Sequence, residues 1–444
     1  MQTYLHSVTL RPEKCKGCTD CIKRCPTEAI RVRNGKATII NERCIDCGMC
    51  IRVCRHHAKR AVTDPLSQIR KYKYKIALPA PTLYAQFKEL QDVNFILTLL
   101  RKIGFDSVYE VAKAAGRVTE MSKSLFQSLN KRPVISSACP AIVRLIQIRF
   151  PSLIENLLPI MSPMEVAARI SKQQAKALGY KEEEIGVFFI SPCPAKATDV
   201  RNPLGIEKSY VDGVISIRDL YLELLCYVKE VSPETIENLQ KSTYDGIQWA
   251  MSGGEGKALG IDKYIAVDGI ENVIRVLEQV ENGTLGDVDF IEALACIGGC
   301  LGGPLTVENS FIAKSRLQRL KKHEQKHKQF INSLRDWDLS FSIQWSKAVD
   351  SKPVLTLDKD MQKAMEKMEK LDKIYSTLPG IDCGSCGAPT CRALAEDIVR
   401  GQAHIEDCVF MLRRRVIEMA QSMVQLSKKL SFPTMGQIKK ENEQ

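Results

Sequence analysis

Seventeen of the 444 residues are cysteines, and all but Cys226 fall into short groups or beside glycines and prolines. The N-terminal segment, MQTYLHSVTLRPEKC, lacks the apolar core of a secretory signal and leads directly into the first group. We therefore expect a cytoplasmic protein, in which clustered cysteines serve as metal ligands more often than as disulfides. The cysteine pattern predicts several metal centres.

The first two groups share one spacing. CKGCTDCIKRCP and CIDCGMCIRVC are both C-x2-C-x2-C-x3-C, the run typical of bacterial ferredoxins with two 4Fe-4S clusters. In that arrangement the fourth cysteine of each run binds the other cluster. We expect one cluster on Cys15, Cys18, Cys21 and Cys54 and the other on Cys44, Cys47, Cys50 and Cys25. Two zinc sites are the alternative, although zinc sites usually combine two pairs of ligands.

Composition excludes some classes of partner. The formal net charge of +12 counts cysteine as neutral, whereas each 4Fe-4S cluster with four thiolates carries about −2. Lysine and arginine are also spread along the chain, so we expect no nucleic-acid partner. Because no apolar run approaches the roughly 20 residues that span a bilayer, we expect no membrane partner either.

The middle of the chain alternates short apolar segments with helical ones. YKIALPA, RPVISSA, IGVFFISPC and KYIAVDGI are candidate buried strands, and FKELQDVNFILTLLRKIG and MEVAARISKQQAKALG have helical periodicity and terminal glycines. This alternation predicts an α/β domain of two lobes with mostly parallel sheets. An α+β ferredoxin-like domain, with a hairpin at Asn34-Gly35, precedes it, and a small helical domain follows.

The expected domains have the following boundaries. Residues 1–72 form the ferredoxin-like domain, 73–350 the α/β domain, 351–375 a helical linker, 376–412 the C-terminal cluster domain, and 413–444 an amphipathic helix and tail.

Four cysteines lie where strands of the α/β domain end: Cys139 in SSACP, Cys193 in SPCPAK, and Cys296 and Cys300 in ACIGGCLGG. Each alone would more often be a small buried residue than a ligand. The surrounding glycines and prolines favour close approach of the backbone to a bulky ligand. Four cysteines from three loops could therefore enclose one cluster between two lobes.

These three segments resemble, in order and content, the signature motifs of the FeFe-hydrogenase catalytic domain. SSACP is similar to T-S-C-C-P, SPCPAKATD to M-P-C-x-x-K-x-x-E, and FIEALACIGGCLGGP to F-M-E-x-M-A-C-x-x-G-C-x-x-G-G. The resemblance covers roughly residues 75–345. It implies the family's H-cluster, a 4Fe-4S cubane joined to a two-iron subsite with CO, CN and a dithiolate amine bridge.

The same resemblance assigns residues to that cofactor. Cys139, Cys193, Cys296 and Cys300 would hold the cubane, with Cys300 bridging to the two irons, and Lys196 would donate to a cyanide. PAPT resembles the family's A-P-S at the other cyanide, and MSGGEG resembles a T-G-G segment near the site. These two segments contribute Ala80, Pro81, Thr82, Ser252, Gly253 and Gly254.

Departures from the family pattern concern proton transfer. Ala138 replaces the cysteine that passes protons to the bridging amine, and alanine has no exchangeable proton. Ser191 and Leu294 replace methionines that pack the two-iron site, Asp199 replaces a glutamate, and LYAQFKEL lacks the usual glutamates. A positioned proton donor contributes about 10²- to 10⁴-fold to a rate, so we expect slow turnover.

Two glutamates could provide another proton route. Glu255 lies in SGGEG, where the family more often has an apolar residue, and Glu292 in FIEAL matches a family glutamate. The alternatives are a solvated loop carboxylate for Glu255 and a structural hydrogen bond for Glu292. We expect Cys226, in the apolar pattern LELLCYV, to be a core residue.

The C-terminal cysteines have the spacing C-x2-C-x4-C-x16-C. They are Cys383, Cys386, Cys391 and Cys408, in a segment that resembles a small 4Fe-4S domain of anaerobic redox proteins. Structural zinc is the alternative. The following segment, FMLRRRVIEMAQSMVQLSKKLSFP, predicts an amphipathic helix that either forms a homodimer, docks a partner or packs on its own domain, and MGQIKKENEQ should be frayed.

Together these features resemble the sensory branch of the hydrogenases. The implied function is slow H2 ⇌ 2H⁺ + 2e⁻ chemistry used for hydrogen sensing, with an H-cluster and three accessory 4Fe-4S clusters. Partners would be H2 and protons, a ferredoxin or signalling protein, and maturation proteins that install the two irons. The alternatives are a non-catalytic iron–sulfur protein without the two-iron subsite and an electron-feeding subunit of a larger complex.

Overall fold

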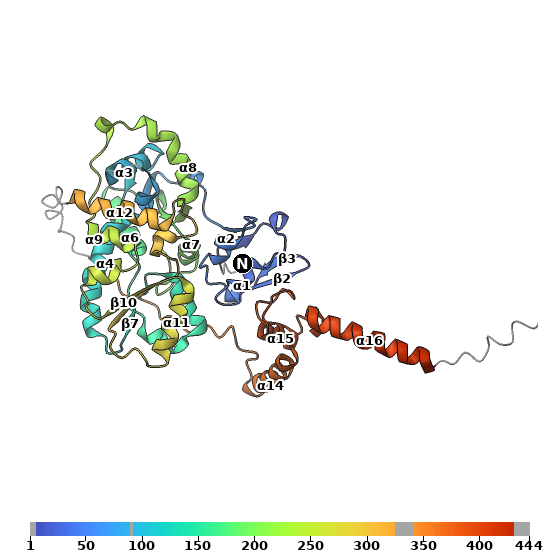
Figure 1. Cartoon of the computed structure of the whole chain (residues 1–444). Coiled ribbons are helices and arrows are strands. Elements are labelled where there is room, and N and C mark those ends of the chain that lie inside the picture. The colour runs from blue at the N-terminus through green and yellow to red at the C-terminus, as the bar shows by residue number, and fades with distance from the viewer. Residues whose placement is uncertain (1–5, 89–91, 325–340, 430–444) are drawn as a thin grey trace, which may run out of the picture. The chain divides into compact units, whose positions relative to one another are not determined.

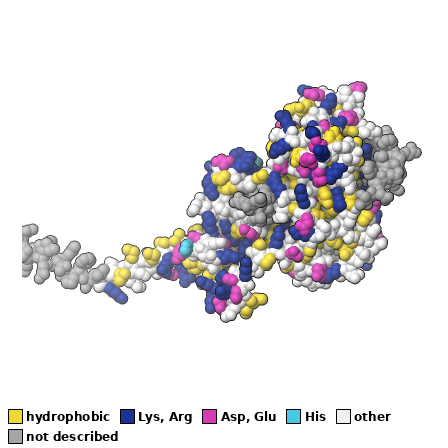
Figure 2. All heavy atoms as spheres, turned by 180° about the vertical axis from the view of Figure 1, so that it is seen from behind, with side chains coloured by type: hydrophobic (Ala, Val, Ile, Leu, Met, Phe, Trp, Pro, Cys, Tyr) yellow, Lys and Arg dark blue, Asp and Glu magenta, His cyan; other side chains and the backbone are white. Residues whose placement is uncertain are grey.

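The computed structural model describes residues 6–88, 92–324 and 341–429 of the chain (Figure 1). It contains two compact units. Unit 1 comprises Met1–Lys16, Arg24–Ala29 and Ile39–Val354, and unit 2 comprises Gly17–Lys23, Ile30–Thr38 and Leu355–Gln444. The N-terminal cysteine segment thus contributes to both units. Over the face shown in Figure 2, basic and acidic side chains are interspersed.

The N-terminal segment contains two small antiparallel elements. In unit 1, β1 (Val8–Leu10) pairs with β4 (Lys59–Ala61), and α2 (Met49–Val53) lies between them in sequence. α1 (Asp20–Lys23) and the two-stranded sheet of β2 (Ile30–Arg33) and β3 (Lys36–Ile39) belong largely to unit 2. Asn34 and Gly35 have φ values of 51° and 71°, as a tight hairpin turn requires, which confirms the predicted hairpin.

The first sheet of unit 1 has four parallel strands in the order β6-β5-β8-β9. These are β6 (Ser107–Val108), β5 (Tyr74–Pro79), β8 (Ile185–Ser191) and β9 (Gly213–Ser216). Because side chains alternate along a strand, Phe188 and Ile190 pack with α3 (Val93–Lys102) and α8 (Ile217–Tyr227) on one face. Val187 and Phe189 pack with α4 (Val111–Ser128) and α6 (Pro163–Ala177) on the other.

The second sheet has three parallel strands in the order β10-β11-β7. β10 (Tyr264–Asp268), β11 (Phe290–Leu294) and β7 (Val134–Ile135) pack against α5 (Pro140–Arg149) and α11 (Ile270–Glu281). β11 is buried throughout, but β10 is an edge strand in which only Val267 is buried, so the expectation of a buried strand there was wrong. The parallel sheets confirm the predicted α/β class.

Four shorter or later helices complete unit 1. They are α7 (Pro194–Arg201), α9 (Tyr244–Ile247), α10 (Gly254–Leu259) and α12 (Ser310–Glu324).

The prediction that Cys226 is a core residue was wrong, because this residue is exposed near the end of α8 while Leu220 and Leu224 face the core. No described helix is both long and apolar enough to cross a membrane.

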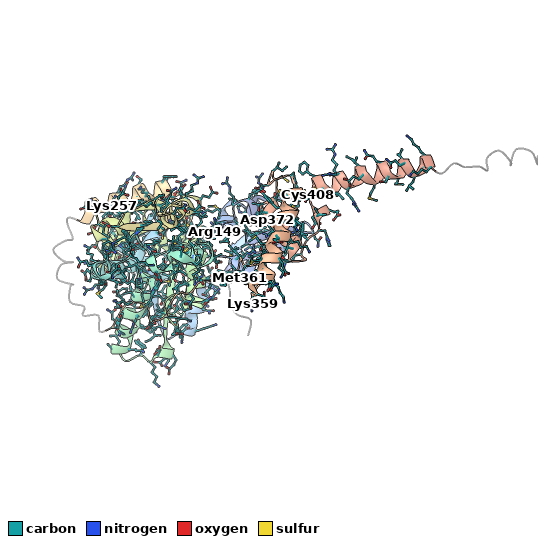
Figure 3. The ribbon with its side chains drawn as sticks, turned by 90° about the horizontal axis from the view of Figure 1, so that it is seen from below. Arg149, Lys257, Lys359, Met361, Asp372 and Cys408 are labelled. Carbon is teal, nitrogen blue, oxygen red and sulfur yellow. The ribbon has the colours of Figure 1, made fainter. Side chains whose placement is uncertain are left out.

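Unit 2 contains α14 (Met361–Thr377), α15 (Cys391–Val399) and α16 (Val409–Lys429). α14 packs on α15 through Leu371, and Figure 3 labels Met361 and Asp372 on α14 and Cys408 directly before α16. None of the described side chains of α16 is buried. The expected frayed tail, 435–444, and the last residues of the predicted helix lie outside the described residues.

Candidate metal centre and its pocket

Parallel strands place three cysteine-bearing loops at one edge of the two sheets. Cys139 follows β7 and precedes α5, Cys193 follows β8 and precedes α7, and Cys296 and Cys300 follow β11. Proline at the first helical position begins α5 and α7 immediately after their cysteines. In open α/β sheets, ligands bind beyond the carboxyl ends of the strands, which is where these sulfurs lie.

The four thiols lie within electrostatic reach of one another. Burial raises the pKa of Cys193 to about 11, and the charge of Cys139 raises it as well. Burial also raises the pKa of Cys296 and Cys300, with further contributions from Cys193 and Cys139. Thiols that resist ionisation together become stable thiolates when a multivalent metal neutralises their charge. The arrangement fits a shared cluster.

Three of these cysteines, all except Cys296, line a cavity of about 110 Å³. Val111, Met164, Phe189, Trp249 and Leu294 give it largely apolar walls. Of the residues predicted for the site, those that line the cavity are Ala80, Pro81, Thr82, Ala138, Cys139, Cys193, Lys196, Glu255, Glu292, Leu294 and Cys300. The sequence motifs are therefore adjacent in space.

Other predicted residues lie behind the cavity wall. Ser191 is fully buried and its hydroxyl donates to the carbonyl of Cys193 at 2.9 Å. Ser252 packs against the loop of Cys300, because a Cβ built on Gly299 would lie 2.8 Å from the backbone nitrogen of Ser252. Gly253 and Gly254 follow at the start of α10. These residues shape the loops that carry the cysteines.

Two polar atoms in the cavity wall have no hydrogen-bond partner among the described residues. They are Thr82 Oγ1 and Lys196 Nζ. The nearest carboxylate oxygen to Lys196 is Oδ2 of Asp199, at 3.7 Å, beyond hydrogen-bond distance. An unsatisfied buried donor costs about 1–3 kcal/mol, so both groups require an acceptor inside the cavity. The cavity therefore fits a group with anionic or acceptor ligands, as the family's two-iron unit has.

A hydrogen-bonded pair of side chains lies beside Ala138. Ser136, which the motif comparison had not singled out, donates to Oε2 of Glu255 at 2.5 Å, and its hydroxyl accepts from the Ala138 amide at 3.3 Å. Burial and the charge of Glu292 raise the pKa of Glu255 to about 8. Only its position in SSACP, two residues before Ala138, could have drawn attention to Ser136.

Glu292 lies next to this pair on β11. It accepts hydrogen bonds from the amides of Gly253 and Gly256 at 3.0 and 2.9 Å. Burial raises its pKa to about 7, although these amides oppose the shift. Glu255 is therefore not a solvated loop carboxylate, because it is only 4% exposed. The two amide contacts of Glu292 are the structural hydrogen bonds that were the alternative for that residue.

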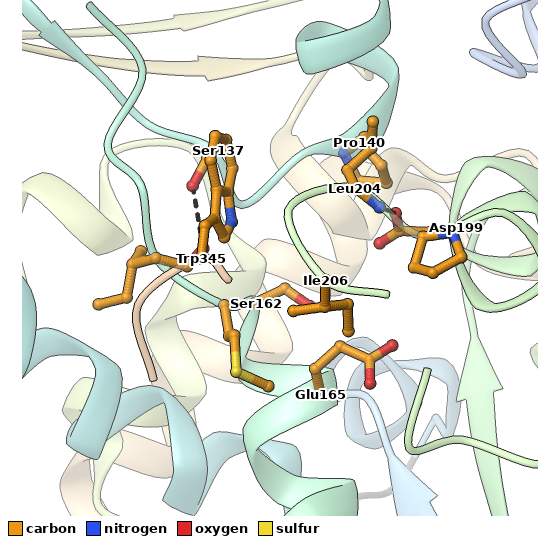
Figure 4. Close-up of a pocket in the computed structure, with 11 residues that line it drawn as sticks. Ser137, Pro140, Ser162, Glu165, Asp199, Leu204, Ile206 and Trp345 are labelled. Atoms are coloured by element: carbon orange, nitrogen blue, oxygen red, sulfur yellow. Dashed lines mark hydrogen bonds between the residues drawn. The ribbon is translucent and has the colours of Figure 1, made fainter. Parts of the chain in front are cut away.

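A second, polar cavity adjoins the segment around Cys139, since Ser137 and Pro140 line it (Figure 4). It has a volume of about 20 Å³, and its lining includes Ser137, Ser162, Glu165 and Asp199. Glu165 accepts from Ser209 Oγ at 2.6 Å, and burial raises its pKa to about 7. Glu165 belongs to no motif, and nothing in the sequence distinguishes it from other helical glutamates.

The second ferredoxin-type ligand set lies near the same centre. Burial raises the pKa values of Cys44 and Cys47, the charges of Cys25 and Cys50 raise them further, and Cys296 also raises that of Cys47. All five residues belong to unit 1. In the other predicted set, Cys15 and Cys54 belong to unit 1, whereas Cys18 and Cys21 belong to unit 2.

The C-terminal cysteines come together within unit 2. Cys391 and Cys408 are buried. Burial raises the pKa of Cys386, and the charges of Cys408 and Cys383 raise it further. Gly384 and Gly387, with φ values of 77° and 79°, allow the loop to turn tightly between these cysteines. The loop geometry fits a cluster.

Comparison with known proteins identifies the same three segments. The family described as iron only hydrogenase large subunit, C-terminal domain, matches residues 73–260 and 227–304. A 4Fe-4S dicluster domain matches residues 7–55, and a putative Fe-S cluster family matches residues 378–410.

Three curated relatives share parts of the chain. Iron hydrogenase 1 of Clostridium pasteurianum is 25% identical in an alignment 370 residues long, which covers 67% of this chain and 64% of that protein. The NADP-reducing hydrogenase subunit HndD of Solidesulfovibrio fructosivorans is 27% identical over 43% of this chain and 33% of its own length. A cytosolic Fe-S cluster assembly factor NAR1 homolog of Schizosaccharomyces japonicus is 32% identical over 29% of this chain and 25% of its own length.

A solved FeFe-hydrogenase of Chlamydomonas reinhardtii aligns with 66% of this chain and 97% of its own. The TM-score is 0.48 and the sequence identity is 14%.

Proposed function

Because the chain belongs to the iron-only hydrogenase large-subunit family, we propose that it catalyses slow H2 ⇌ 2H⁺ + 2e⁻ chemistry and uses it for hydrogen sensing. Its iron–sulfur domains and parallel α/β fold are those of a redox protein. The chain covers less than two thirds of its hydrogenase relatives, so the activity itself is inferred from the residues of the cavity.

Four thiolates would hold the cubane of the H-cluster: Cys139, Cys193, Cys296 and Cys300. When bound, the two-iron subsite supplies an open iron site and a bridging amine base for heterolytic cleavage of H2. Lys196 and Thr82 would donate hydrogen bonds to its cyanide ligands, and Phe189, Trp249 and Leu294 would exclude water. A charge-assisted hydrogen bond to a buried anion is about twice as strong as a neutral one, which explains a lysine here.

Protons would move through Ser136 and Glu255 rather than through a thiol at position 138. The hydroxyl of Ser136 bonds to Glu255, and Glu255 reaches the cavity wall together with Glu292. A carboxyl group with a pKa of about 8 is protonated at neutral pH and can both donate and accept a proton. Ala138 carries no exchangeable proton and cannot pass protons from this pair to the bridging amine. We therefore expect slow turnover through this route.

Electrons would leave through the accessory clusters. The electrostatic contact between Cys47 and Cys296 supports transfer from the cubane to the cluster of Cys25, Cys44, Cys47 and Cys50. A ferredoxin or signalling protein would then receive them. The hydrogenase relative HndD is a subunit of an NADP-reducing enzyme, which supports a role with redox partners.

The observation that carries this proposal is the pair of donors without a partner among the described residues, Lys196 Nζ and Thr82 Oγ1, in the wall of a cavity that three of the four cysteines also line. The test is the infrared spectrum of protein matured anaerobically with the proteins that install the two irons. We expect bands of bound CO and CN that change under H2. Protein with iron–sulfur clusters but without maturation should lack these bands.

The second candidate is a non-catalytic iron–sulfur protein without the two-iron subsite. The match to a cluster assembly factor and the replacement of two family methionines by Ser191 and Leu294 support it. Absence of CO and CN bands after full maturation, with all 4Fe-4S clusters present, would establish this alternative instead.

A further inference from the structure

Unit 1 contains a third cavity, of about 1070 Å³, which is larger than the two described above and is lined by none of the cysteines. Its walls come from α2, from β4 and the residues after it, from the start of α8, and from the segment 302–310 that leads into α12. We call it the Lys59 cavity. Its size is that of a small-molecule binding site.

The lining of the Lys59 cavity is predominantly basic. Four arginines and one lysine line it: Arg11, Arg52, Arg60, Arg218 and Lys59. Its two acidic residues are Asp219 and Glu308, and the carboxylate of Glu308 is already paired with Arg316 at 2.6 Å. The excess of positive charge favours an anionic ligand.

Lys59 is the residue that most requires such a ligand. It lies on β4, is only 4% exposed, and its Nζ has neither a hydrogen-bond partner nor a paired carboxylate among the described residues. Burial of an ammonium group without a counter-charge costs several kcal/mol. Because Lys59 lines the cavity, a compact anionic group bound there would offset part of this cost.

Two helices also begin at this cavity. Ser216 precedes α8, and Asn309 and Ser310 are at the start of α12. The N-terminus of a helix carries a partial positive charge and favours phosphate or carboxylate nearby. Apolar walls from Ile51 and Leu305 accompany these polar groups, as in sites for organic anions.

We infer that the Lys59 cavity binds a small molecule with a chain of two or more phosphate groups, such as a nucleoside polyphosphate. Lys59 is buried whereas Arg52 and Arg60, in the same lining, are exposed, so a slender polyphosphate can pair with more of these basic groups than a single phosphate can. A convex acidic protein surface is less suited to reach a lysine that is 4% exposed.

The test is isothermal titration of the full chain, with its iron–sulfur clusters reconstituted, using ATP, ADP, tripolyphosphate and inorganic phosphate. We expect saturable binding of ATP, ADP and tripolyphosphate, and at least about tenfold weaker binding of inorganic phosphate. Equal binding of ATP and tripolyphosphate would identify the phosphate chain as the recognised part, and tighter binding of ATP would add the nucleoside.

Substitution then locates the ligand. Lys59→Met should weaken ATP binding by about tenfold or more, since a hydrogen bond to a charged group contributes about 1.5–3 kcal/mol. Arg60→Gln, on the exposed side of the cavity, should weaken it less, and Lys208→Met, outside the cavity, should leave it unchanged. Without ligand, Lys59→Met should raise the melting temperature, because it removes an unpaired buried charge.

Three outcomes would overturn the inference. The first is no saturable binding of any of the four probes. The second is unchanged ATP affinity in Lys59→Met together with a lower melting temperature and an altered spectrum of the reduced clusters, which would assign the ammonium group to a cluster. The third is binding of an acidic ferredoxin at this face, lost in Lys59→Met, without binding of polyphosphates.

Discussion

Ser136 Oγ lies 2.5 Å from Oε2 of Glu255, and the same hydroxyl accepts a hydrogen bond from the amide of Ala138. A polar link thus connects a buried carboxyl group with the position where related hydrogenases are expected to carry a thiol. The residues that are joined come from the loop after β7 and from α10, 119 positions apart in sequence.

Replacement of Ala138 by cysteine should accelerate turnover. A thiol at this position would add a proton donor at the cavity wall, and such donors contribute about 10²-fold or more. Hydrogen evolution by matured protein with a chemical reductant measures the effect. Ala138→Val, which adds volume but no proton, is the matched control and should not accelerate the reaction.

Replacement of Glu255 by glutamine should slow hydrogen evolution by about 10²-fold, because an amide cannot exchange its proton in the same way. Glu255→Asp should retain part of the rate, since it keeps the carboxyl group. The infrared bands should persist in both variants, which would show that the cofactor is still bound. An unchanged rate in Glu255→Gln would remove this residue from the proton route.

The same substitution should change the dependence of stability on pH. The pKa of Glu255 is raised from 4.5 to about 8, so the folded state holds a proton that the unfolded state releases. Stability of the wild type should therefore fall as pH rises from about 4.5 to about 8. The melting temperature of Glu255→Gln relative to wild type should rise across this window and remain level above it. A constant difference would show that Glu255 ionises normally.

Replacement of Lys196 by methionine should remove the donor to the two-iron unit while keeping the length of the side chain. We expect loss or strong weakening of the CO and CN bands, with the content of 4Fe-4S clusters preserved. Lys172→Met is a suitable control, because Lys172 pairs with Asp212 at 2.8 Å outside the cavity. Full bands in Lys196→Met would contradict the role of Lys196.

Replacement of Cys391 by alanine tests the C-terminal cluster. It should remove about four irons per chain without removing zinc, and it should leave the infrared bands unchanged. Metal analysis of anaerobically purified protein measures both elements. Loss of about one zinc and no iron would establish a structural zinc site instead.

A buried ion pair should stabilise unit 2. Asp397 accepts from Arg31 at 2.7 and 3.0 Å and from Arg33 at 2.8 Å, and the side chains of Arg31 and Asp397 are at least nine-tenths buried. Asp397→Asn should cost about 3–5 kcal/mol, as for other broken buried pairs, and should lower the denaturation midpoint of this unit. Glu418→Gln, which breaks the exposed pair with Arg414, should have almost no effect.

The sequence alone determined the local parts of this protein. Cysteine spacing indicated the iron–sulfur segments because ligands of one loop must be a fixed number of residues apart, and Asn34-Gly35 indicated a hairpin because both residues accept positive φ. The alternation of apolar and helical segments likewise predicted parallel sheets.

Only the tertiary structure decided which distant residues meet. β11 lies between β10 and β7, which brings Glu292 to the same cavity as Ala138, and no local pattern specifies that strand order. The hydrogen bond from Ser136 to Glu255, the unpartnered Lys59 and the pairing of Arg31 with Asp397 likewise depend on packing between segments far apart in sequence. Burial then sets the pKa of Glu255, because the cost of removing charge from water depends on the surrounding fold and not on neighbouring letters.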